Sequence, residues 1–159
     1  MGAVPSRVAG FIAEGRVGRL GTADADGQPL VVPICYAFDG EAIFSAIDAK
    51  PKSRNPEGLK RIRNIRDNPK VSVVIDRYDE DWRALRYVII LGRAALLTEG
   101  GEFARGVDLL LAKYPQYRAM GLAREAGLMI RVKPARVTDW QFAPGDGRGP
   151  GALAAPAGD

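Results

Sequence analysis

Residues 17–47 read VGRLGTADADGQPLVVPICYAFDGEAIFSAI, and this stretch decides the fold. Three apolar segments, 17–22, 30–38 and 41–47, are separated by two turn signals. The second signal, Asp39-Gly40, is typical of tight hairpins because glycine accepts a positive φ. The stretch therefore predicts three antiparallel strands in a meander.

The rest of the chain alternates helices with strands. Helices are expected at 5–14, 57–67 and 102–114, and further strands at 71–76, 87–97, 128–133 and 136–142, with a bend at Pro134. In the helix at 57–67 we expect Leu59, Ile62 and Ile65 to face inward, with Lys60 and Asn64 on the opposite face. Six or seven strands with a few inserted helices predict a mainly β fold, a small closed or nearly closed antiparallel barrel.

The predicted domain spans 1–142 and is followed by a tail at 143–159. The tail consists almost entirely of Ala, Gly, Pro and Asp, and Leu153 is its only large aliphatic residue. Because it has so little apolar surface to bury, we expect this tail to be disordered.

The strand at 87–97 is apolar on both faces. A strand of that kind is normally covered on both sides. We expect a second copy of the chain to cover the side that the barrel does not, which would make the protein a homodimer.

Composition excludes several classes of chemistry. The chain has 159 residues, no histidine and a single cysteine, Cys35, which we expect to be buried in a strand. This excludes Ser-His-Asp and Cys-His catalysis, the HExxH metal site and an internal disulfide. A bound cofactor would therefore carry the chemistry of an enzyme built on this chain. No apolar run reaches the roughly 18 residues of a membrane span, and no signal peptide is visible, so we expect a cytoplasmic protein without a membrane partner.

Positive charge is concentrated between residues 50 and 70. Eight lysines and arginines and two acidic residues lie there, so this segment carries +6 while the whole chain carries +4. Lys50 and Lys52 follow the end of a strand, and Arg61 lies in the next helix. Lysine and arginine bind phosphate, so we expect some of these residues to do so. The alternatives are a solvated basic helix face and a nucleic-acid surface; the second is disfavoured because the patch is local and has few aromatic neighbours.

A second candidate site is the strand pair itself. Residues 31–34 and 44–47 are expected to lie side by side across the hairpin, where Ser45 offers a hydroxyl and backbone N–H groups could reach a flat heterocycle. Pro33 cannot donate to a strand ladder. Its alternative interpretation is an edge strand or a bulge.

An acidic cluster consists of Asp76, Asp79, Glu80 and Asp81. A hard metal ion is conceivable there. We favour a solvated turn that pairs with Arg77 or Arg83, and we expect no metal site.

In the order of several motifs, the chain resembles the pyridoxamine 5′-phosphate oxidase-like split-barrel flavoproteins. This resemblance implies an FMN-binding-like split barrel. The motifs are Arg19-Leu20-Gly21-Thr22-Ala23, Asp26-Gly27-Gln28-Pro29-Leu30-Val31-Val32-Pro33, Asp39-Gly40, Lys50-Pro51-Lys52 and Asn64-Ile65-Arg66-Asp67-Asn68-Pro69-Lys70-Val71-Ser72. Within that family, the stretches at 76–82 and 113–117 resemble the coenzyme F420-dependent (deazaflavin) reductases. The resemblance covers about residues 7–142.

The resemblance implies a homodimer with two cofactor sites at the subunit interface. The residues that match the phosphate-binding positions are Lys50, Lys52 and Arg61. The cofactor ring would lie against Val32, Pro33, Ile34, Ser45 and Ala46. The partner subunit would contribute Trp82, Arg86 and Tyr87.

The function that the resemblance implies is an F420-dependent oxidoreductase that passes a hydride between reduced deazaflavin and an unsaturated small molecule. An FMN-dependent oxidase or reductase of the same fold and a non-catalytic flavin- or deazaflavin-binding protein are the alternatives. Tyr87 is a candidate proton donor, with solvent as the other source. The chain lacks the C-terminal arginine and histidine pattern of the pyridoxamine phosphate oxidases proper, which disfavours vitamin B6 oxidation.

Overall fold

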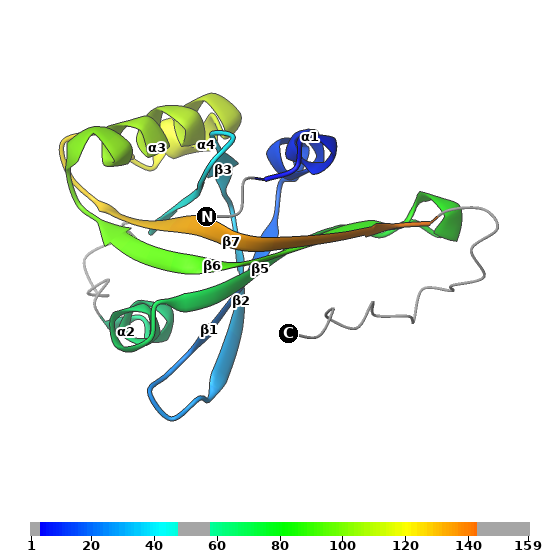
Figure 1. The fold of residues 1–159 in the computed structure, drawn as a ribbon. Coiled ribbons are helices and arrows are strands. Elements are labelled where there is room, and N and C mark those ends of the chain that lie inside the picture. Colours follow the sequence, from blue (N-terminus) through cyan, green and yellow to red (C-terminus); the bar gives the residue numbers. More distant parts are fainter. Residues whose placement is uncertain (1–3, 48–57, 143–159) are drawn as a thin grey trace.

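The computed structural model describes residues 4–47 and 58–142. Seven antiparallel strands form one curled sheet, a half-barrel, in the order β2-β1-β5-β6-β7-β4-β3 (Figure 1). The strands are β1 Gly18–Ala23, β2 Pro29–Ile34, β3 Ala37–Phe38, β4 Ile43–Ile47, β5 Lys70–Arg77, β6 Arg86–Leu97 and β7 Leu128–Gln141. The prediction of a mainly β, antiparallel split-barrel fold is confirmed.

The connection between β2 and β3 explains why the sheet curls. These are the two edge strands, yet only Cys35 and Tyr36 separate them in the chain. A flat seven-stranded sheet would hold its edges about 29 Å apart. The chain from Ile34 to Ala37 spans at most about 11 Å. The sheet must therefore bend until its two edges approach each other.

Two hydrophobic clusters lie on the two faces of the sheet. Inside the curl, the strands pack with Phe11 and Ile12 of α1 (Ser6–Glu14) and with Ile62 and Ile65 of α2 (Lys60–Asp67). Outside it, α3 (Gly100–Lys113) and α4 (Gln116–Ala119) cover β3 and β4. Figure 1 shows α3 and α4 together on one side of the sheet, away from α2. No helix in the described ranges is long and apolar enough to cross a bilayer.

The segment 30–38 differs from the prediction of one strand. It divides into β2, which pairs with β1, and β3, which pairs with β4. The backbone N–H of Tyr36 donates to the Tyr114 hydroxyl at 3.2 Å instead of to a neighbouring strand, and the Tyr36 hydroxyl donates to the Ile12 carbonyl at 2.5 Å. The expected pairing of 31–34 with 44–47 is therefore wrong.

The bend expected at Pro134 is a β-bulge within one continuous strand. Leu91 lies opposite Arg136 and Gly92 opposite Pro134, so β7 has one extra residue, Ala135. A bulge tolerates proline because the ladder is interrupted there. Glycine is required on the facing strand, since a Cβ on Gly92 would collide with the Lys133 carbonyl.

The outer face of β6 is open in the single chain. Val88 and Ile90 point inward and are fully buried, whereas Leu91 on the other face is 46% exposed. The outer cluster under α3 and α4 includes neither Ile89 nor Leu91. The second apolar face expected for this strand is present.

Candidate functional site

The basic segment is described from Gly58 onward, so Lys50 and Lys52 lie outside the described residues. Arg61 lies in the first turn of α2 and is half-buried. Its Nε is buried and has no hydrogen-bond partner. The neighbouring Lys60, in contrast, pairs with Asp24 at 3.0 Å. Arg61 is therefore a basic side chain of α2 with a donor still unsatisfied, which fits an anionic group.

Asn64 fixes α2 to the barrel. Its side-chain amide donates to the Thr22 hydroxyl at 3.0 Å, and both side chains are buried, with 0% and 3% exposure. We expected Asn64 on the outward face of the helix, and that expectation is wrong. The helix contacts β1 as well as β6, so it is buried over a wider arc than one apolar stripe.

The residues of β2 point alternately to the two faces of the sheet. Val32 and Ile34 point into the core. Val31, Pro33 and Cys35 are exposed on the other face, and Val31 is 65% exposed. Cys35 is therefore exposed, and the expectation that it is buried is wrong. β2 is an edge strand, which agrees with the edge interpretation of Pro33.

Ser45 and Ala46 are covered by the chain itself. The Ser45 hydroxyl donates to the Cys35 carbonyl at 2.8 Å, and the side chain is 4% exposed. Ala46 is 8% exposed and packs in the cluster under α3. The hydrogen bond ties β4 to the end of β2. Of the ring-contacting residues expected on β4, Ser45 thus contacts the chain at the β2–β3 junction, and β2 and β4 share no ladder.

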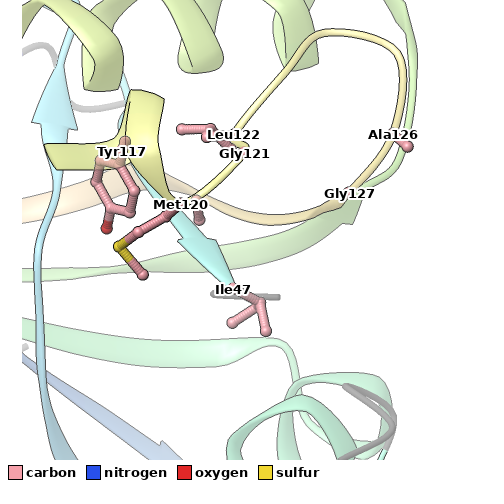
Figure 2. A pocket seen from close by; sticks show the side chains of 8 residues that line it. Ile47, Tyr117, Met120, Gly121, Leu122, Ala126 and Gly127 are labelled. Carbon is pink, nitrogen blue, oxygen red and sulfur yellow. The ribbon is translucent and has the colours of Figure 1, made fainter. Parts of the chain in front are cut away.

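A small apolar cavity of about 40 Å³ lies at the end of β4, next to Ile47 and the loop after α4 (Figure 2). Tyr117, Met120 and Leu122 come from the α4 side, as Figure 2 shows. Small-molecule sites usually have about 300–1,000 Å³. This cavity is too small for a cofactor.

Three further candidate site residues are Trp82, Arg86 and Tyr87. Trp82 lies in the single turn η2 (Trp82–Ala84) and is 53% exposed. The Arg86 guanidinium lies 4.5 Å from the centroid of the Phe11 ring and donates to the Arg7 carbonyl, while its Nε is buried without a partner. The Tyr87 ring stacks on Trp140, with centroids 5.7 Å apart. Aromatic packing thus fixes both Arg86 and Tyr87.

α2, which carries Arg61, and η2, which carries Trp82, lie at opposite ends of β5. α2 ends just before this strand, and η2 follows it. The strand has eight residues, a length of about 26 Å. Figure 1 shows α2 and η2 at opposite ends of the β5–β6 hairpin. A single chain therefore does not bring Arg61 and Trp82 to one site.

The acidic turn is satisfied by arginine. Both carboxylate oxygens of Asp81 accept from Arg83 at 2.8 Å, which lowers the pKa of Asp81. Asp76 pairs with Arg19 of β1. The described residues include no group of three or more His, Cys, Asp or Glu that could hold a metal ion. The pairing of Asp81 with Arg83 agrees with the solvated-turn interpretation.

Lys113 begins the stretch 113–117 of the resemblance, but the sequence pattern predicts no role for it. Its ammonium donates to the Gly15 carbonyl at 2.5 Å and lies 4.2 Å from the centroid of the Tyr36 ring. Burial, followed by the charge of Arg16, lowers its pKa to about 8. A lysine at a helix C-terminus is common, so the sequence offered no signal of this environment.

Known proteins resemble this chain in fold and in sequence. Residues 4–141 match the family model described as pyridoxamine 5′-phosphate oxidase. A 5a,11a-dehydrotetracycline/5a,11a-dehydrooxytetracycline reductase of Streptomyces rimosus subsp. rimosus is 29% identical over 124 residues, which cover 77% of this chain and 72% of the relative.

Solved structures share the fold. A FAD-binding protein of Mesorhizobium loti superimposes with a TM-score of 0.62 at 26% identity, covering 84% of this chain and 89% of that one. An F420 reductase superimposes with a TM-score of 0.59 at 21% identity, covering 85% and 98%. An oxidoreductase is the activity class that the comparisons support. The family match covers nearly the whole described chain, and the protein belongs to the pyridoxamine 5′-phosphate oxidase family.

Proposed function

We propose that the protein is an F420-dependent oxidoreductase that reduces an unsaturated small molecule. The observation that carries the proposal is the buried, unpartnered Nε of Arg61 at the start of α2, within a segment of net charge +6. F420 has a phosphate and a tail of carboxylates, so it is more anionic than FMN. The reductase name of the Streptomyces relative supports the direction of the reaction.

The proposal includes a homodimer. α2, which carries Arg61, and η2, which carries Trp82, lie at opposite ends of β5, a strand about 26 Å long, so the two residues are expected to contact one cofactor when they come from different subunits. The open outer face of β6, with Leu91 46% exposed, is the apolar surface that a second copy would bury.

Each group of residues then has a defined task. Arg61, with Lys50 and Lys52, holds the phosphate. The exposed face of β2 at Pro33 and the β2–β3 junction face the ring. Trp82, Arg86 and Tyr87 of the partner subunit close the site and exclude water. When bound, the cofactor supplies the hydride. The chain has no histidine, so solvent or the Tyr87 hydroxyl supplies the proton.

A FMN- or FAD-dependent oxidoreductase is the second candidate. It is favoured by the similarity to the FAD-binding protein of Mesorhizobium loti. The phosphate site would be shared by the two cofactor classes, and the carboxylate tail is what would distinguish them.

In the test the protein is titrated with F420, with FMN and with FAD, and binding is monitored by fluorescence and thermal shift. Arg61→Gln should weaken the preferred cofactor about 10- to 100-fold, because a charge-assisted hydrogen bond contributes about 1.5–3 kcal/mol. Arg63→Gln, which removes an exposed charge from the same helix, is the matched control. Tighter binding of FMN or FAD than of F420 would assign the second candidate. Absence of binding by all three cofactors would contradict both candidates.

A further inference from the structure

A cavity of about 530 Å³ opens beside the β-bulge between β6 and β7. Its volume lies within the range of small-molecule sites, about 300–1,000 Å³. Three cations, Arg93, Arg131 and Lys133, form part of its wall. The remaining lining residues are small or apolar: Pro69, Ala94, Pro134 and Ala135.

The strand register places three cations in a row. Lys70 of β5 lies opposite Arg93 of β6, and Arg93 lies opposite Lys133 of β7. Side chains that face each other across antiparallel strands point to the same side of the sheet, and like charges in that arrangement are destabilising. No carboxylate among the described residues pairs with any of the three.

Arg131 adds a fourth positive charge in a less exposed position. Its side chain is 15% exposed, and its Nε is buried without a hydrogen bond. The nearest carboxylate oxygen, Oε2 of Glu102, lies 3.6 Å away, beyond hydrogen-bond length. One partly exposed glutamate therefore faces four cations, and the cavity keeps a surplus of positive charge.

We propose that this cavity binds a small polyanion, a molecule with two or more phosphate or carboxylate groups. Guanidinium groups bind such oxygens in pairs, and Pro134, Ala135 and Ala94 offer contact to an apolar body. Such an anion would remove the repulsion along the row of Lys70, Arg93 and Lys133.

The site is separate from the proposed cofactor phosphate site. Pro69 follows the C-terminal end of α2, whereas Arg61 lies in its first turn. Pro69 lies eight positions after Arg61, and the six helical steps from Arg61 to Asp67 alone span about 9 Å along the helix axis. The proposal does not rest on the identity of the cofactor, and a free metabolite and the carboxylate tail of a cofactor share the required chemistry.

The test uses the full-length protein without added cofactor, titrated by calorimetry with inorganic pyrophosphate and with a tri-glutamate peptide at matched ionic strength. We expect Arg93→Gln/Lys133→Gln to weaken binding at least 10-fold. The control Arg63→Gln/Arg118→Gln removes the same charge from exposed positions outside the cavity and should bind as the wild type does.

In a second arm, F420 with an intact tail is compared with F420 whose tail has been removed. A loss in the cavity variant that depends on the tail would identify the cofactor as the source, and binding of the free anions alone would identify a metabolite.

Equal binding by the cavity variant and the wild type, or no binding of any of these anions to the wild type, would overturn the proposal. The proposal would also be overturned if the cavity variant changed its oligomeric state but bound the anions as the wild type does. That result would show that the cations face carboxylates of a second copy.

Discussion

The side-chain amide of Asn64 on α2 donates a hydrogen bond to the hydroxyl of Thr22 on β1 at 3.0 Å, inside the protein. This bond links the helix that carries Arg61 to the first strand of the barrel. The other amide atom, Oδ1, is buried without a partner. The position of Arg61 thus depends on a polar contact between elements that are far apart in the sequence.

Asn64→Ala should lower the free energy of unfolding by about 1 kcal/mol or more, because it leaves the buried Thr22 hydroxyl without its donor and removes packed atoms. Urea unfolding followed by circular dichroism measures this change. Arg63→Ala, the exposed neighbour on the same helix, should stay within about 0.5 kcal/mol of the wild type. Equal stability of the two variants would show that the contact contributes nothing.

Gly92→Ala should destabilise the protein by about 1–3 kcal/mol, because the added methyl group meets the Lys133 carbonyl at the bulge. Gly10→Ala is the matched control. Gly10 lies within α1, and a Cβ there meets nothing within 4 Å. Alanine is favoured over glycine in a helix by about 0.5–1 kcal/mol, so this control should raise the unfolding midpoint. A neutral Gly92→Ala would mean that the bulge relaxes freely.

Local signals predicted most of the strands and helices. Asp39-Gly40 marked the hairpin between β3 and β4, and Pro134 marked the bulge in β7. These signals are read from one or two residues and need no knowledge of the partner strand. The apolar periodicity of α1, α2 and α3 likewise located each helix to within a few residues.

The predictions are wrong where contacts between residues far apart in the sequence determine the structure. Nothing within 30–38 shows that Tyr114, far along the chain, takes the backbone N–H of Tyr36 and ends β2. Asn64 is polar, so its burial against Thr22 depends on how α2 lies across the barrel. The homodimer that would join the candidate site residues is itself a proposal, and Lys50, Lys52 and the tail at 143–159 lie outside the described residues. Their roles stay predictions.

Lys113 should make stability depend on pH above neutrality. Its pKa in the folded protein is lowered to about 8 from the ordinary 10.5, chiefly by burial. Between these values the unfolded chain binds a proton that the folded protein has released, so stability should rise with pH from about 8 to about 10. Burial raises the pKa of Tyr114, which gives the opposite trend above its ordinary value of 10.

Urea unfolding at pH 7, 8, 9 and 10 tests this. Lys113→Met should lose the rise that the wild type shows across that range, whereas Lys70→Met, at an exposed position on β5, should keep it. Parallel pH profiles for the wild type and Lys113→Met would contradict the assignment.

The open face of β6 predicts how the protein assembles. Leu91 projects from that face and is 46% exposed, and a second copy would bury it. Light scattering of the wild type at micromolar concentration should give a mass near twice 17.1 kDa. Leu91→Arg would place a charge in an apolar interface without a partner, which costs several kcal/mol, so this variant should be a folded monomer. Met120→Arg alters a side chain of similar exposure, 47%, in the loop after α4 on the covered side of the sheet, and this variant should stay dimeric.

The Leu91→Arg monomer should also lose cofactor affinity, because Arg61 of one subunit and Trp82 of the other would no longer meet. Its unfolding transition should remain cooperative. A wild-type mass near 17.1 kDa, or a Leu91→Arg monomer that binds cofactor as tightly as the wild type, would show that one chain forms the whole site.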